Sequence, residues 1–233
     1  MKARVSGVPG IKRESIFHAL NQKAVARRYA KSIGKKYEEL NLIVVHLGGG
    51  ISVGAHRKGL VIDVNNALNG EGPISPERAG TVPSEALATL CFSGKYTLNE
   101  VKKMLHGKAG LAAYLGTSDM ITIEEKAIEG KEPYKTLVAA MDYTVAKEIG
   151  AMFVALKGQC DAIILTGGIA YSDYCVADIK EQIEYLCKVV VLPGENEMES
   201  LAENAFGALT GELPVLTYTG VSCAEEIPGM AEA

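Results

Sequence analysis

The chain has 233 residues and a net charge of −4 at pH 7. Hydrophobic residues make up 48% of it and charged residues 22%, which is typical of a soluble globular protein with a core and excludes disordered, collagen-like and low-complexity chains. At about 150 residues per domain, this length allows one large α/β domain or two small ones.

The charge is distributed unevenly. Residues 1–36 contain ten Lys or Arg residues and one acid, Glu14, a local charge of +9, so the remainder carries −13. A basic arm of this kind is one way to bind nucleic acid, but its aromatic residues are only Phe17 and Tyr29. We therefore expect no nucleic-acid partner.

The cysteines and the apolar segments indicate the compartment. Five cysteines form no CxxC pair and their number is odd, which favours reduced thiols. The polar, basic N-terminus has no apolar signal region, and no apolar run reaches the roughly 20 residues that cross a bilayer. These features predict a cytoplasmic protein with no membrane partner.

The first third of the chain predicts one helix and three strands. Apolar residues at helical spacing predict a helix over 15–33, with Ser15 as its cap and Gly34 as its stop. Apolar runs separated by tight turns predict an antiparallel meander of three strands, at 42–47, 51–56 and 60–65.

The rest of the chain predicts a loop followed by alternating helices and strands. Glycines and prolines over 69–83 indicate a loop, and Thr97 with Glu100 could form a capping box. Three hairpin-linked strands followed by alternating helix and strand predict an α/β fold of ribonuclease-H-like order, a mixed five-stranded sheet flanked by helices. The later elements are expected as helices at 84–92, 97–106, 134–157, 172–187 and 200–210 and strands at 162–166 and 189–192.

Two glycine turns each follow an apolar strand. The first is Gly48, Gly49 and Gly50, with His46 before it, and the second is Gly167 and Gly168 with Ile169. Glycines let the backbone N–H groups approach a phosphate closely, and a helix beginning near Ser172 could add its positive end. The alternative is that these glycines only make tight turns.

Four polar residues are further candidates, each with a plainer alternative. Arg78, in a loop stiffened by prolines, could clamp a phosphoryl group or be a surface arginine. His18 could be catalytic or a partly buried structural residue. Asp119 could contact a ligand or cap the helix that follows it, and Glu197 could bind Mg²⁺ or lie on a solvated acidic face.

Three stretches of the chain carry a resemblance to a known family. They are HLGGGISVGAHRKGLVIDVNNALNGEGPISPERAG at 46–80, SIFHALNQKAVARRYA at 15–30 and DAIILTGGIAYSD at 161–173. Together they resemble the acetate/butyrate kinase family of the actin-like, sugar-kinase superfamily. The first is most similar to butyrate kinases, since acetate kinases typically have Asn at the position of Gly49. The resemblance implies an actin-like ATPase domain that uses ATP and Mg²⁺ to convert butyrate or a branched analogue into its acyl phosphate.

The resemblance also implies a role for each candidate residue. Arg78 matches the arginine that stabilises the phosphoryl group during transfer, and His18 the histidine that hydrogen-bonds it. Glu197 matches the carboxylate that positions Mg²⁺. The remaining residues would bind the nucleotide: His46, Gly48, Gly49 and Gly50 at the phosphates, Gly167, Gly168 and Ile169 at the adenosine, and Asp119 near the nucleoside.

Family members carry a further domain ahead of these motifs, with another phosphate loop and a catalytic aspartate that this chain does not match. We therefore expect residues 1–36 to be a basic lead-in helix from the domain junction, facing the cleft, 37–221 a C-terminal nucleotide-binding kinase domain, and 222–233 a tail. The chain by itself is expected to turn over little substrate, and the family resemblance implies a homo-oligomer. A non-catalytic nucleotide-binding or scaffold domain that acts through a partner chain is the alternative.

Overall fold

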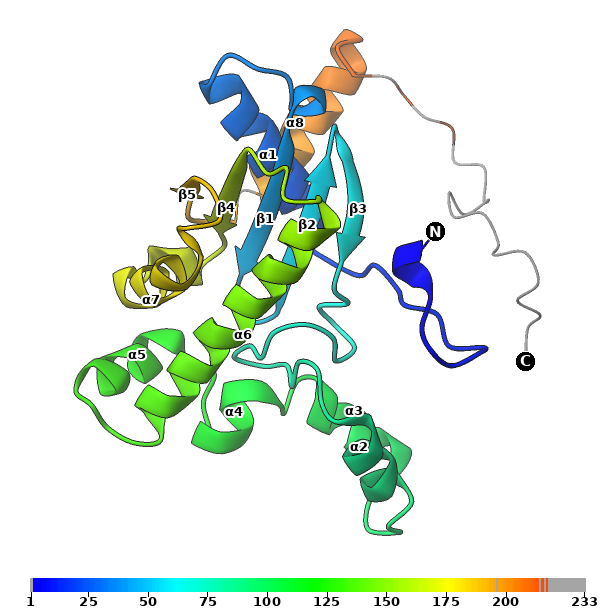
Figure 1. Ribbon diagram of the computed structural model, residues 1–233, viewed down its shortest axis with the longest axis vertical. Coiled ribbons are helices and arrows are strands. Elements are labelled where there is room, and N and C mark those ends of the chain that lie inside the picture. The colour runs from blue at the N-terminus through cyan, green and yellow to red at the C-terminus, as the bar shows by residue number, and fades with distance from the viewer. Residues whose placement is uncertain (1, 196, 214, 216, 218–233) are drawn as a thin grey trace.

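One mixed sheet forms the centre of the molecule (Figure 1). The computed structural model describes residues 2–195, 197–213, 215 and 217, so the predicted tail at 222–233 lies outside the described residues. The strand order is β3-β2-β1-β4-β5; β1 pairs antiparallel with β2 and parallel with β4, as the predicted ribonuclease-H-like order requires. The strands are β1 (Asn41–Leu47), β2 (Ile51–Arg57), β3 (Leu60–Val64), β4 (Ala162–Thr166) and β5 (Val189–Val191).

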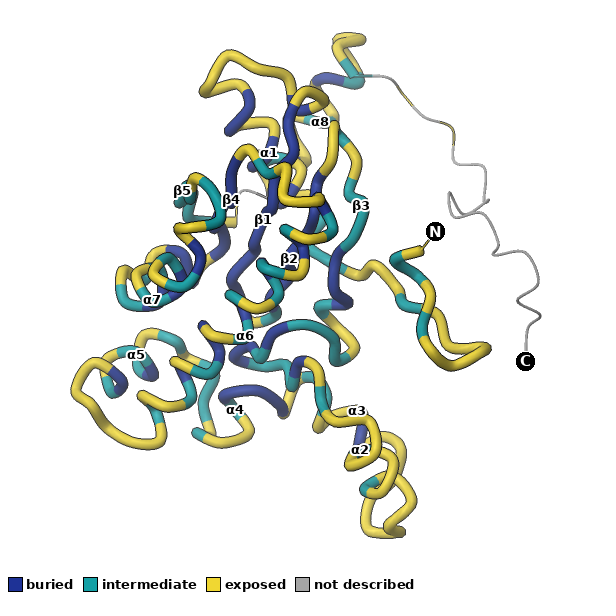
Figure 2. Tube along the Cα trace, viewed as in Figure 1, coloured by how far each residue is buried: buried dark blue, intermediate teal, exposed yellow. Residues whose placement is uncertain are grey.

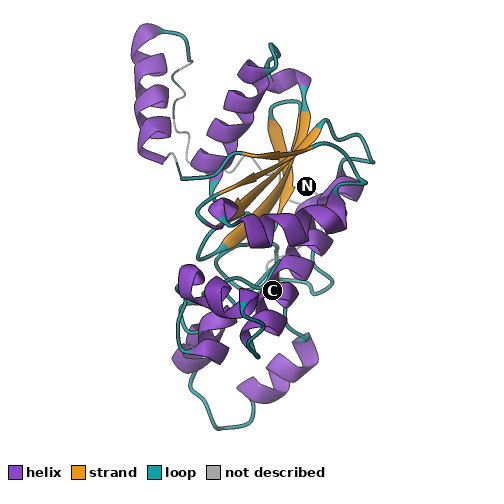
Figure 3. Cartoon of the chain, turned by 90° about the vertical axis from the view of Figure 1, so that its left-hand side faces the viewer, coloured by secondary structure: helices purple, strands orange, loops and turns teal. Residues whose placement is uncertain are grey.

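Helices cover both faces of this sheet (Figure 3), which explains why β1 and β4 are buried along their whole length. On one face, α1 (Ala19–Ser32) packs through Val25 and Tyr29 on Leu42 and Val44 of β1, and α8 (Glu197–Thr210) packs against α1. On the other face, α6 (Tyr134–Ala155) and α7 (Asp173–Ile183) enclose the larger core (Figure 1).

Four shorter helices lie beyond one end of the sheet. They are α2 (Ser84–Cys91), α3 (Leu98–Leu105), α4 (Gly110–Leu115) and α5 (Met120–Ile128). Figure 2 shows α2 and α3 projecting from the body with most of their surface exposed. Short 3₁₀ turns occupy Lys2–Arg4, Tyr37–Glu39 and Ile169–Tyr171. Within the described residues, no helix combines the length and the apolar character that crossing a membrane needs.

Most predicted elements are confirmed, including the capping box of Thr97 and Glu100 and the left-handed Gly34 after α1. The predicted start of the first helix at Ser15 is wrong. The helix begins four residues later, because the segment before it is held outside the helix by a hydrogen bond of 2.9 Å from Ala67 N–H to the Ile16 carbonyl. Helix α4 and the 3₁₀ turns lie in segments for which no helix was predicted.

Candidate functional site

The two glycine turns lie together at one edge of the sheet. Because β1 and β4 are parallel neighbours, both strands end at this edge. Gly167 has φ +89°, and a Cβ atom at this residue would overlap the carbonyl oxygen of Leu47, the last residue of β1. The backbones of Gly167 and Gly194 also exchange hydrogen bonds of 3.2 and 3.0 Å. The fold itself therefore requires glycine at 167.

The loop that contains Ser75 and Glu77 holds the Gly48–Gly50 turn in place. The carbonyl oxygen of Gly49 accepts hydrogen bonds of 2.7 Å from Ser75 Oγ and 3.1 Å from Glu77 N–H. None of the three glycines lies at positive φ. The turn conformation is therefore open to other residues, and what the glycines supply is an absence of side-chain bulk.

Arg78 lies beside this turn, and one of its N–H groups has no acceptor among the described residues. A Cβ on Gly50 would stand 3.8 Å from Arg78 Cγ and 3.9 Å from Arg78 Nε. Arg78 Nη1 donates to the Glu77 carbonyl at 3.2 Å and lies 3.6 Å from the Glu77 carboxylate. Nε of Arg78 is buried and has no hydrogen-bond partner among the described residues. A buried N–H without an acceptor is costly, and an anion beside the turn would satisfy it.

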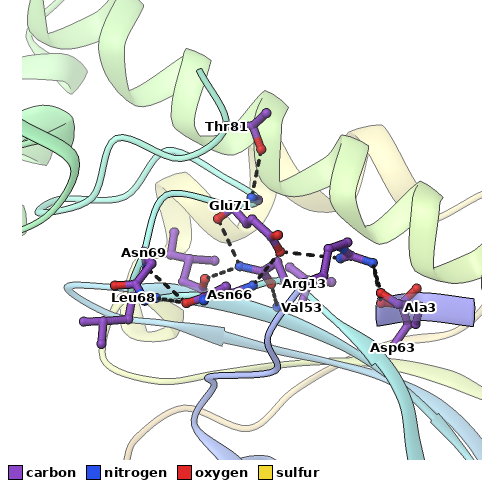
Figure 4. A network of polar contacts seen from close by, with 12 residues as sticks. Ala3, Arg13, Val53, Asp63, Asn66, Leu68, Asn69, Glu71 and Thr81 are labelled. Atoms are coloured by element: carbon purple, nitrogen blue, oxygen red, sulfur yellow. Dashed lines mark hydrogen bonds and ion pairs between the residues drawn. The ribbon is translucent and has the colours of Figure 1, made fainter. Parts of the chain in front are cut away.

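A polar network fixes the start of the loop that carries Arg78 (Figure 4). Asn65 Oδ1 accepts from Val53 N–H of β2 at 2.8 Å, and its Nδ2 donates to the Glu71 carbonyl at 3.3 Å. Arg13 bridges two acids, with Nη1 at 3.3 Å from Asp63 and Nη2 at 3.5 Å from Glu71. The N-terminal segment is thereby tied to both the sheet and the loop.

His46 and His18 stack face to face next to the first turn. Their ring centroids are 3.7 Å apart and their planes differ by 11°. Burial, and to a smaller degree His18, lowers the pKa of His46 to about 3. His46 is therefore neutral at pH 7, and its contact of 3.3 Å with Glu195 Oε1 is not an ion pair. Its Nε2 stands 3.1 Å from the position of a Cβ on Gly48, so the ring adjoins the turn.

The structure thus brings His18, His46, the Gly48–Gly50 turn and Arg78 together at one edge of the sheet, while their roles toward a ligand stay predictions. The predicted contact of the second turn with adenosine stays a prediction. Gly168 is exposed there, but Ile169 is only 7% exposed and belongs to the hydrophobic core.

Asp119 takes the plainer of its two predicted roles. It caps α5, since its Oδ1 accepts from Ile121 N–H at 3.2 Å and its Oδ2 from the Thr122 hydroxyl. The bond from Thr122 holds the pKa of this exposed carboxyl below its usual range. The preceding Ser118 donates to Glu77 at 3.2 Å, which links this segment to the Arg78 loop. A contact between Asp119 and a nucleoside stays a prediction.

No metal centre forms among the described side chains. Glu197 is the first residue of α8, but its side chain lies outside the described part of the structure. In that part, no group of three His, Cys, Asp or Glu residues could hold a metal ion. Mg²⁺ in nucleotide sites commonly takes only one or two carboxylates together with phosphate oxygens and water. A role for Glu197 therefore stays a prediction.

Four buried polar residues behind His18 escaped the sequence analysis. Ser52 Oγ lies 2.9 Å from His18 Nδ1 and 2.8 Å from Gln22 Nε2. Gln22 Oε1 lies 2.9 Å from His56 Nε2, and His56 Nδ1 lies 2.7 Å from the Tyr37 hydroxyl. Burial lowers the pKa of His56 to about 4. Their spacing was the available signal, since His18 and Gln22 are four apart near a helix start, and Ser52 and His56 are four apart on a strand.

The basic charge of α1 does not all face this edge. Arg27, Arg28 and Lys31 instead line a cavity of about 540 Å³ between α1 and α8, together with Glu199 and Glu203. The expectation that the basic lead-in segment faces the cleft stays a prediction. The charge of these three cations is complemented by acids of α8.

The arrangement suits binding and transfer of a phosphoryl group. It offers a guanidinium with an unused N–H, an open glycine turn and two stacked imidazoles. Phosphoryl transfer needs positioning and positive electrostatics rather than a covalent nucleophile.

Comparisons with known proteins agree with this chemistry. Residues 6–206 match the model of the acetokinase family. A protein of Phocaeicola vulgatus named probable butyrate kinase is 71% identical over 216 residues, which cover 93% of this chain and 61% of that protein. A Bacteroides thetaiotaomicron protein of the same name is 56% identical over the same shares. The chain thus spans about 61% of the length of these relatives.

Solved structures show the same fold at low sequence identity. Acetate kinase of Porphyromonas gingivalis superposes with a TM-score of 0.77 at 21% identity, over 88% of this chain and 60% of that one. A propionate kinase of Francisella tularensis gives 0.75 at 21% identity, over 85% and 59%. These likenesses confirm the predicted actin-like ATPase fold.

Proposed function

Because the chain belongs to the acetokinase family, we propose that it supplies the nucleotide-binding part of a cytoplasmic kinase that phosphorylates a short-chain fatty acid with ATP. Butyrate or a branched analogue is the proposed acceptor, because the relatives above are named probable butyrate kinases. The γ-phosphoryl group of ATP moves to a carboxylate oxygen, and the products are ADP and an acyl phosphate.

The buried Nε of Arg78 beside Gly50, which has no hydrogen-bond partner in the described part of the chain, carries this proposal. In the proposed reaction, Arg78 stabilises the charge on the phosphoryl group as it leaves ADP, and His18 donates a hydrogen bond to it. The backbone of the Gly48–Gly50 turn, next to Arg78, binds the phosphates. Mg²⁺ would neutralise charge on the phosphates, with Glu197 as its proposed carboxylate.

The test is acyl phosphate formation, trapped as the hydroxamate. The assay uses the chain alone and the chain joined to the part of the Phocaeicola vulgatus relative that the match does not cover. In the joined protein, Arg78→Ala should lower kcat/KM for ATP and butyrate by about 100-fold or more, roughly 3 kcal/mol, as the loss of a preorganised donor does. The control is Arg57→Ala, which removes an exposed arginine at the end of β2 and should leave the rate unchanged.

Two outcomes would count against the proposal. A rate for Arg78→Ala within twofold of the parent would reject the role of this arginine. ATP binding without acyl phosphate formation in the joined protein would favour the non-catalytic scaffold.

A further inference from the structure

The polar residues behind His18 form a chain of hydrogen bonds that runs inward from the site to Tyr37. Each member uses its groups on its neighbours, and Ser52, Gln22 and His56 are each 0% exposed. These three side chains are therefore shielded from bulk water. The direction of each bond can be worked out from one fixed group.

That fixed group is the carbonyl oxygen of Ser52, which lies 3.2 Å from Gln22 Nε2. A carbonyl can only accept, so the NH₂ end of the Gln22 amide must face it. The same NH₂ group then donates its second hydrogen to Ser52 Oγ at 2.8 Å. The oxygen end of the amide is left facing His56 Nε2 at 2.9 Å.

The amide oxygen of Gln22 sets the tautomer of His56. Because this oxygen accepts, His56 Nε2 must carry a hydrogen. His56 is neutral at pH 7, so its Nδ1 has a lone pair and accepts from the Tyr37 hydroxyl at 2.7 Å. Every bond from Tyr37 to Ser52 thus points toward the site.

The last bond reaches His18. Ser52 Oγ already accepts from Gln22, so its own hydrogen needs an acceptor, and the one that the described structure provides is His18 Nδ1 at 2.9 Å. We propose that Gln22, Ser52 and His56 are positioning residues that hold His18 in the tautomer with its hydrogen on Nε2. The ring then presents an N–H donor on the side away from Ser52.

The tautomer of His18 is inferred from the geometry alone, and only the use of its N–H group rests on the proposed function. If His18 hydrogen-bonds the phosphoryl group, a fixed Nε2–H makes it a donor in every molecule, with no fraction in the wrong tautomer. Hydrogen bonds that all point in one direction polarise one another. The chain from Tyr37 to His18 would therefore also resist an exchange of its donors and acceptors.

The tautomer is measured directly by ¹⁵N NMR of the imidazole nitrogens, on the full 233-residue chain at about pH 8, above the usual histidine pKa of about 6.5. The chain has only four histidines, so single substitutions assign every ring. We expect His18 and His56 to carry hydrogen on Nε2. A hydrogen on Nδ1 of His18 would overturn the proposal.

Two variants test the cause. Ser52→Ala removes the hydroxyl, so His18 should become a mixture of tautomers. Gln22→Glu replaces the group that donates to Ser52 with one that accepts. The Ser52 hydroxyl should then donate to the new carboxylate instead of to His18, and His18 should shift to the tautomer with its hydrogen on Nδ1. Gln182→Leu is the matched control, since Gln182 is a helical glutamine bonded within α7 to Asp178. It should leave the His18 signals unchanged.

Kinetics of the joined protein separate this inference from the proposed function. Ser52→Ala should lower kcat about tenfold, the value of one hydrogen bond, with KM for ATP unchanged. If Ser52→Ala leaves the tautomer as it was, the inference is wrong even when the kinase is active. If the tautomers respond as expected but no variant or parent forms acyl phosphate, the inference stands and the proposed function fails.

Discussion

The two glycine turns look alike in sequence but differ in what they do for the protein. Gly167 sits at positive φ, and its missing Cβ is what lets β4 end against the last residue of β1. The Gly48–Gly50 turn needs no positive φ, and the atoms nearest to Gly48 and Gly49 belong to side chains, which can give way. Packing requires a glycine at position 167, whereas the glycines at 48–50 keep the space beside the turn free of side chains.

The difference separates the two interpretations that the sequence left open. Glycine as a tight-turn residue describes Gly167, which joins the backbone at the strand ends. Glycine as a phosphate-binding residue is favoured for the Gly48–Gly50 turn, which is flanked by Arg78, His46 and His18. The packing role is shown for Gly167, whereas phosphate binding at the Gly48–Gly50 turn and adenosine binding at the second turn stay predictions.

The largest expected effect is on stability at Gly167. Gly167→Ala should destabilise the fold by about 3 kcal/mol or more, because it combines a left-handed backbone with overlap on the Leu47 carbonyl. The measurement is urea denaturation followed by circular dichroism. The control is Gly168→Ala next to it, where no atom lies within 4 Å of the added Cβ and the change should stay within about 0.5 kcal/mol. Equal stability of the two variants would remove the distinction between the turns.

A smaller effect, on ligand binding, is expected at Gly50. Gly50→Ala adds a methyl group 3.2 Å from the Ala67 carbonyl and 3.9 Å from Arg78 Nε. Calorimetry should show ATP binding weakened about tenfold, or about 1.4 kcal/mol, with less loss of stability than in Gly167→Ala. Gly150→Ala, in the middle of α6 with open space around it, is the matched control and should leave ATP binding unchanged. A Gly50→Ala protein that binds ATP like the parent would show that this turn is not at the phosphates.

The sequence predicted the sheet well because each buried strand is an apolar run bounded by turn residues, as in 42–47 before Gly48. It misplaced the start of α1 because Ser15 is a good local cap, yet the backbone there pairs with Ala67, far along the chain. It missed α4, a helix of six residues, because so short a segment has no readable period and begins at a glycine with φ +61° that packs on the backbone of Ser75.

The site was predictable where residues belong to one motif, as Gly48–Gly50 and Arg78 do. The partners of His18 were not, because Gln22 comes from α1, Ser52 and His56 from β2, and Tyr37 from the 3₁₀ turn between them. Only packing of the helix on the sheet joins them. The side chain of Glu197 lies outside the described residues, so its predicted role was not tested by the fold.

Backbone amide shifts on addition of Mg·ATP to the 233-residue chain give the most direct test of where the nucleotide phosphates bind. The amides of Gly48, Gly49 and Gly50 and the Arg78 Nε–H should shift most, and those of α2 and α3 should stay unchanged. The strongest shifts falling instead in the cavity between α1 and α8, or no shift at the turn when ATP is bound, would contradict the account.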